Sequence, residues 1–111
     1  MSNNNISKLI ESRTVLLTEL ATLTQMLHGS FLERYSVCSR KNCRCHTGKR
    51  HGPRCYVVVN INGKQKQKYI PITQVSAAKN GVYQYQRLQE IVEEITHINL
   101  KLIRESVYAD S

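Results

Sequence analysis

The sequence has no tryptophan, a single phenylalanine and no long apolar run. No segment approaches the ~20 consecutive apolar residues that a membrane-spanning helix requires. The first five residues lack the basic and apolar regions of a signal peptide. These absences predict a cytoplasmic protein that makes no contact with a membrane and whose thiols stay reduced.

Carboxylates are missing from the part of the chain that is richest in reactive side chains. All four cysteines lie between Cys38 and Cys55, and this segment contains no Asp or Glu. A catalytic zinc ion needs an open coordination position and a nearby general base. The sequence also lacks paired carboxylates, a nucleophile–base pair and a phosphate-binding loop. We therefore predict that the protein is not an enzyme.

The length of 111 residues predicts a single domain, residues 1–111, with a core small enough to need further stabilisation. The net charge is +8, and it is concentrated in the middle of the chain. Residues 31–70 contain ten basic side chains and one acidic side chain, whereas the two flanks are close to neutral. A basic centre between neutral flanks favours a polyanionic partner.

Two stretches have the apolar spacing of amphipathic helices. After a disordered start at 1–5, leucine and isoleucine recur at helical spacing over 6–28, and Gly29 follows as a helix stop. The same spacing over 74–106 predicts a longer helix, in which Gly81 permits a kink. The apolar faces of the two helices are expected to pack against each other in antiparallel orientation.

Between the helices, residues 55–70 have the pattern of a two-stranded β-hairpin. The first half is rich in β-branched side chains, and Asn62-Gly63 is a typical tight-turn dipeptide. Residues 30–36 are expected to connect the first helix to the cysteine segment. The return strand alternates and therefore places three cations on one face: Lys64, Lys66 and Lys68.

The cysteine-rich segment 36–55 predicts a zinc knuckle, because cysteines this close in sequence can reach one ion from a tight turn. Such a structural Zn²⁺ ion would contribute folding free energy to a segment with little apolar content. The C-x4-C-x-C spacing supplies three ligands: Cys38, Cys43 and Cys45. His51 is favoured as the fourth because the rigid Gly52-Pro53 bend follows it, with Cys55 and His46 as alternatives. Four free thiols without a metal are the competing interpretation.

The cysteine spacing, followed by His51-Gly52-Pro53, a hairpin and a long helix, resembles a family of small bacterial proteins of unknown function. Genes of that family often lie in mobile elements, beside transposases or on phages and plasmids. The resemblance covers about residues 29–105. It implies ligation by the three cysteines of the C-x4-C-x-C motif and by His51. The chain departs from the family pattern at Arg54 and Cys55, where aromatic residues are usual.

These elements predict an α+β fold in which two long antiparallel helices flank a zinc knuckle and a two-stranded hairpin. The predicted function is zinc-stabilised, non-catalytic binding of nucleic acid, DNA more than RNA, in an accessory protein of a mobile element. The alternative is a protein-interaction module that forms a homodimer through its helices or docks on a larger partner such as a recombinase. The cations expected to contact phosphates are Arg40, Lys41, Arg44, Lys49, Arg50, Arg54, Lys64, Lys66 and Lys68.

Overall fold

A computed structural model describes residues 3–36 and 51–110, with side chains for 5–35 and 53–110. The chain divides into two compact units. Met1–Gln25 and Gln84–Ser111 form one, called here the helical unit, and Met26–Tyr83 form the other, called the sheet unit. Helix α2 (Val75–Arg104) begins in the sheet unit and continues into the helical unit.

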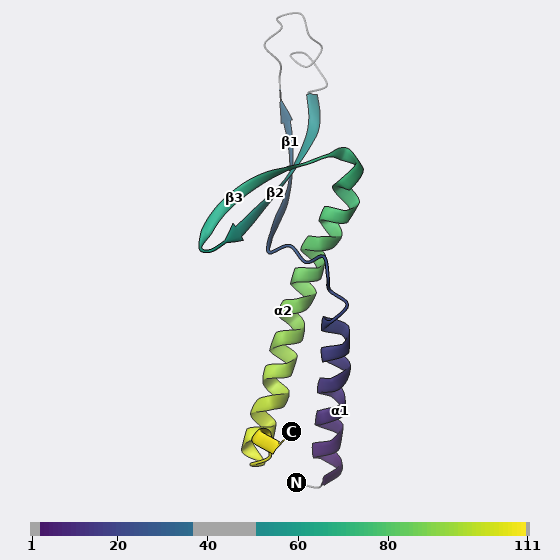
Figure 1. Cartoon of the computed structure of the whole chain (residues 1–111), viewed down its shortest axis with the longest axis vertical. Helices are drawn as coiled ribbons and strands as arrows, with labels where there is room; N and C mark the ends of the chain where they lie inside the picture. The colour runs from purple at the N-terminus through teal and green to yellow at the C-terminus, as the bar shows by residue number, and fades with distance from the viewer. Residues whose placement is uncertain (1–2, 37–50, 111) are drawn as a thin grey trace, which may run out of the picture. The chain divides into compact units, whose positions relative to one another are not determined.

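In the helical unit, helix α1 (Asn3–Leu20) lies along the C-terminal part of α2 (Figure 1). The two are antiparallel, because Arg13 bonds to Asn99 while Glu19, further along α1, bonds to Arg87, earlier on α2. The apolar stripes meet in a core that partly buried leucine and isoleucine side chains surround. The buried members of this core are Leu16, Leu23, Ile91, Ile98 and Leu102.

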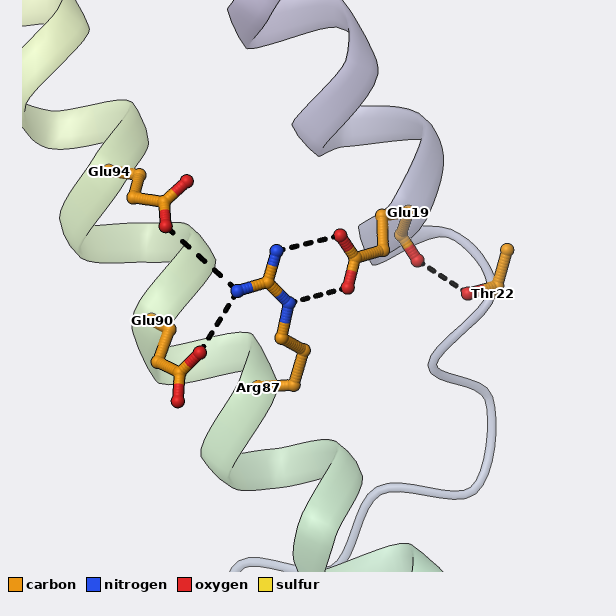
Figure 2. A network of polar contacts seen from close by, with 5 residues as sticks. All are labelled: Glu19, Thr22, Arg87, Glu90 and Glu94. Carbon is orange, nitrogen blue, oxygen red and sulfur yellow. Dashed lines mark hydrogen bonds and ion pairs between the residues drawn. The ribbon is translucent and has the colours of Figure 1, made fainter.

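Charged side chains fasten the same two helices together (Figure 2). The Arg87 guanidinium donates two hydrogen bonds to the Glu19 carboxylate, at 2.5 and 2.8 Å, and a third to Glu90 at 2.9 Å. Glu94 lies 3.9 Å from the same group. The hydrogen bonds from Arg87, with a smaller contribution from its charge, lower the pKa of Glu19, and burial opposes them only in part. The carboxylates in turn raise the pKa of Arg87.

Helix α1 ends at Leu20, earlier than the predicted end at residue 28. The last turn is tightened by bonds between residues three apart, from the Thr22 N–H to the Glu19 carbonyl and from the Leu23 N–H to the Leu20 carbonyl. The Gln84 side chain then accepts a hydrogen bond from the backbone of Gln25. Leu23 continues the apolar spacing of the helix without being part of it, and it is still buried.

The sheet unit is built on a three-stranded antiparallel sheet in the order β1-β2-β3 (Figure 1). The strands are β1 (Gly29–Ser36), β2 (His51–Ile61) and β3 (Lys64–Ile70). Asn62 and Gly63 join β2 to β3 with φ angles of 52° and 75°, which is the backbone conformation that a two-residue hairpin turn requires. The two-stranded hairpin that the sequence predicted is therefore wrong, because a third strand pairs with β2.

The third strand is the segment expected to be a connector, and it changes the role of Gly29. Gly29 does not stop a helix; it begins β1, opposite Val59. A Cβ atom at this position would overlap the carbonyl oxygen of Val58, so the close approach of the two strands requires glycine. Strand β2 begins at His51, within the segment 36–55 that is predicted to be the knuckle.

The register between β1 and β2 shifts between Arg34 and Ser36, where Ser36 pairs with His51. Pro53 lies at this irregularity. It precedes Cys55, the first residue of β2 that pairs with β3. Proline has no N–H to donate, so within sheets it is confined to such bulges and to edges. The register shift thus lets β2 contain a proline although it is the central strand.

The start of α2 packs in the sheet unit. The buried hydrophobic side chains here are Cys55 and Val57 from β2 and Ala78 from α2. The Leu27 N–H donates to the Gly81 carbonyl at 2.9 Å, and α2 continues through Gly81 as a single helix. In the part of the chain that the structure describes, no helix combines the length and the apolar content that crossing a membrane requires.

Candidate nucleic-acid interface

The strand register divides the side chains of the sheet between two faces, because directly paired residues in an antiparallel sheet project to the same side. Val57 pairs with Phe31 and Lys68, and the side of the sheet on which these three side chains lie is called the lysine face. Tyr56 pairs with Leu32 and Tyr69, and this side is called the tyrosine face.

The lysine face combines the small core of the sheet unit with three exposed cations. Lys64, Lys66 and Lys68 pair with Ile61, Val59 and Val57 respectively. The three lysines are exposed, whereas Val57 is only 1% exposed. The predicted alternation of the return strand therefore places its lysines together on one face of the sheet.

The cations of the sheet unit have very little negative charge near them in sequence. Residues 26–83 contain one carboxylate, Glu33. Its Oε1 atom lies 3.9 Å from the Nζ atom of Lys79, which also lies 5.1 Å from the centre of the Phe31 ring. Among the described residues, no ion pair involves the remaining cations of the unit: Arg34, Arg54, Lys64, Lys66 and Lys68.

The tyrosine face holds an ordered group of polar and aromatic side chains. The Arg34 guanidinium lies 5.4 Å from the centre of the Tyr56 ring and donates a hydrogen bond of 2.8 Å to Oε1 of Gln67. The Tyr56 and Tyr69 rings meet edge to face, with centroids 5.9 Å apart. Arg34 is not among the predicted site residues, because the sequence predicts a connector over residues 30–36. No period-two apolar pattern marks this segment, because apolar and charged side chains occur at both odd and even positions over 31–35.

The structure describes some of the predicted site residues and not others. Arg54 and the three lysines of β3 lie on the sheet, on opposite faces. The other predicted phosphate-binding cations lie outside the described residues: Arg40, Lys41, Arg44, Lys49 and Arg50.

Of the predicted zinc ligands, Cys38, Cys43 and Cys45 also lie outside the described residues, as does His46. His51 is the first residue of β2, and its side chain is not among those described. Cys55 is a buried free cysteine whose β-sheet neighbours are Glu33 and Ile70. Within residues 3–36 and 51–110, no group of three or more His, Cys, Asp or Glu side chains is placed to hold a metal ion.

Over the residues that the structure describes, the protein is a small α+β protein that consists of two α-helices, α1 and α2, and a three-stranded sheet with many basic residues and one carboxylate. The chain belongs to the family described as a domain of unknown function, DUF6788, whose profile matches residues 6–80. The match covers α1 from Ile6 onward, the whole sheet and the first turns of α2. Comparison with curated proteins and with solved structures gives no match.

Proposed function

We propose that the sheet unit binds nucleic acid, DNA in preference to RNA, and that it does so without catalysis. The observation that carries the proposal is the imbalance of charge in this unit. Five described cations lie on its strands, and its one carboxylate already lies beside Lys79. Phosphates supply the missing negative charge, and each phosphate neutralised by Lys or Arg releases a condensed counterion.

A simpler explanation exists for the lysines of β3. This strand is at the edge of the sheet, and edge lysines discourage the pairing of strands from different molecules. That role does not produce affinity for a polyanion. A titration of binding to a DNA duplex against salt therefore separates the two explanations, because the logarithm of the binding constant falls by ~0.9 per logarithmic unit of salt for each phosphate contact.

The sharpest test compares two triple variants that remove the same charge from different units. Lys64→Gln, Lys66→Gln and Lys68→Gln together should weaken binding by roughly 100-fold at low salt and reduce the salt slope by about three. The matched control is Lys8→Gln, Lys101→Gln and Arg104→Gln in the helical unit, which should leave both quantities close to wild type. Equal losses in the two variants, or no binding by the wild type at low salt, would refute the proposal.

We also propose a structural zinc ion held by Cys38, Cys43, Cys45 and His51. Support comes from the cysteine spacing and from the pairing of Ser36 with His51, which brings His51 beside the strand end that leads to Cys38. Burial of Cys55 in the sheet explains that thiol by packing alone. We expect stoichiometric zinc in the purified protein, loss of zinc in Cys43→Ser and its retention in Cys55→Ser. Full occupancy in Cys43→Ser would contradict this ligand set.

The cellular setting is a proposal from the sequence. We propose a cytoplasmic accessory protein of a mobile element, on the strength of the resemblance carried by the cysteine motif and His51-Gly52-Pro53. Loss of element mobility on deletion of the gene, and its return with the wild-type gene, would support this role. Unchanged mobility in the deletion strain would contradict it.

One observation favours a second function, in which the helical unit forms a homodimer or docks on a larger protein. Val92 and Ile103 are exposed and lie about three helical turns apart, so they share one side of α2, and Leu100 lies nearby. Water-exposed aliphatic side chains in such a row are typical of helix–helix contacts between chains. Sedimentation of the wild type and of Ile103→Glu tests self-association. A dimeric wild type and a monomeric Ile103→Glu variant would support it, and a monomeric wild type would refute it.

A further inference from the structure

The tyrosine face takes no part in burying the core of the sheet unit. The buried residues of the sheet, Cys55 and Val57, lie on the lysine face. On the tyrosine face, none of the described residues is buried, and Tyr69 is 60% exposed. An exposed aromatic ring on a carboxylate-free face is not explained by packing.

Contacts within the face hold Tyr69 in place and still leave it accessible. Arg34 lies over the Tyr56 ring and is itself fixed by its hydrogen bond to Gln67. Tyr56, so positioned, meets Tyr69 edge to face, at an interplanar angle of 72°. Ordering a ring before a ligand arrives lowers the conformational entropy that binding must remove.

The composition of the face indicates its ligand. The charged and amide side chains near the two rings are Arg34, Arg54 and Gln67, with Leu32 and Val58 on the same face, and the carboxylate of the sheet, Glu33, pairs with Cys55 on the other face. Guanidinium and amide groups bind phosphates and base edges, and an exposed tyrosine ring stacks on a base. A duplex keeps the flat sides of its bases covered, so only unpaired bases can use such a ring.

We propose that the tyrosine face binds single-stranded nucleic acid, with Tyr69 stacked on an unpaired base and Arg54 bound to an adjacent phosphate. Arg34 and Gln67 act as positioning residues through Tyr56. This inference rests on the proposed function, and it specifies that the sheet binds single-stranded nucleic acid in preference to a duplex. The lysine face then contributes attraction to phosphates that does not depend on whether the bases are paired.

The experiment measures binding of the full, zinc-supplemented protein to oligothymidine, to the RNA oligouridine and to a DNA duplex, at one salt concentration. Tyr69→Leu should weaken binding to both single strands about tenfold and leave duplex binding unchanged. Tyr69→Phe keeps the ring and should bind like the wild type. Tyr83→Leu is the matched control, because Tyr83 is 63% exposed but lies on α2, and this variant should behave like the wild type.

Tyrosine fluorescence gives an independent readout, because the chain contains no tryptophan. Oligothymidine should quench part of the emission of the wild type, and the quenched part should be smaller in Tyr69→Phe. Tyr69→Leu that binds single strands like the wild type, or that weakens the duplex equally, overturns this inference and leaves the proposed function standing. A wild type that binds neither form of nucleic acid at low salt overturns both.

Discussion

The two units of this protein handle charge and apolar surface in opposite ways. In the helical unit, Arg87 contacts three carboxylates, and the apolar side chains of both helices meet in a buried core. In the sheet unit, the cations of the strands have one carboxylate between them, and only Cys55, Val57 and Ala78 are buried apolar residues among those described.

Under the proposed function, this difference separates the part of the chain that provides stability from the part that binds nucleic acid. Charges neutralised within a fold have little electrostatic attraction left for a partner, whereas unneutralised cations set up a positive field that attracts one. In the helical unit, the charge of Arg87 is neutralised by carboxylates of the same unit. The sheet unit has an excess of positive charge, which a polyanion can neutralise. The following substitutions test whether the division holds.

The largest effect on stability is expected in the core of the helical unit. Ile91 is 0% exposed, and Ile91→Ala removes packed methyl groups that both helices surround. The free energy of unfolding should fall by about 2–5 kcal/mol, as measured by urea denaturation. A nearby exposed residue gives a control, since Gln89→Ala should change the free energy of unfolding by roughly 0.5 kcal/mol or less. Similar losses in the two variants would contradict a closed core.

A smaller effect is expected at the first residue of β1. Gly29→Ala places a Cβ atom against the Val58 carbonyl and should cost roughly 1–3 kcal/mol. Amide hydrogen exchange should accelerate in β1 and β2 more than in α1, because the clash is confined to the sheet. Ser30→Ala, one residue further along the strand, is the control. Uniform acceleration throughout the chain would show that the two units do not open separately.

The smallest effect is a change in the acid sensitivity of the helical unit. The pKa of Glu19 is lowered from 4.5 by hydrogen bonds from Arg87, so the folded state favours its ionised form. This stabilisation is present above pH 4.5 and is lost as the pH falls from 4.5 through the lowered value. Glu19→Gln should therefore lose less stability than the wild type over this range, in melting curves recorded at successive pH values. Glu93→Gln, at an exposed carboxylate, should follow the wild type. The wild-type dependence of stability on pH in Glu19→Gln would argue against the pairing of Glu19 with Arg87.

The helices and the turn could be predicted because their signals are local. The apolar period that ends in Leu102 and Ile103 is readable within a window of a few turns, and Asn62-Gly63 favours positive φ angles wherever it occurs. The end of α1 is less readable, because Leu23 keeps the helical period after the helix has ended.

The third strand could not be predicted, because its stability comes from a distant partner. Residues 29–36 contain glycine, two serines and a glutamate, and only pairing with β2 makes them a strand. The same pairing brings Arg34 to Tyr56, so the arrangement of the tyrosine face was hidden for the same reason. The lysines of β3 were found because strand alternation alone decides which side chains share a face.

The pairing of Ser36 with His51 has a consequence for how such chains evolve. The two residues are held together by the sheet, and whatever lies between them in sequence begins and ends at adjacent points. Doubling the length of a connection between fixed ends costs only about 0.6 kcal/mol. We therefore expect family members to differ in the length of this stretch outside the C-x4-C-x-C motif far more than in the register of the strands.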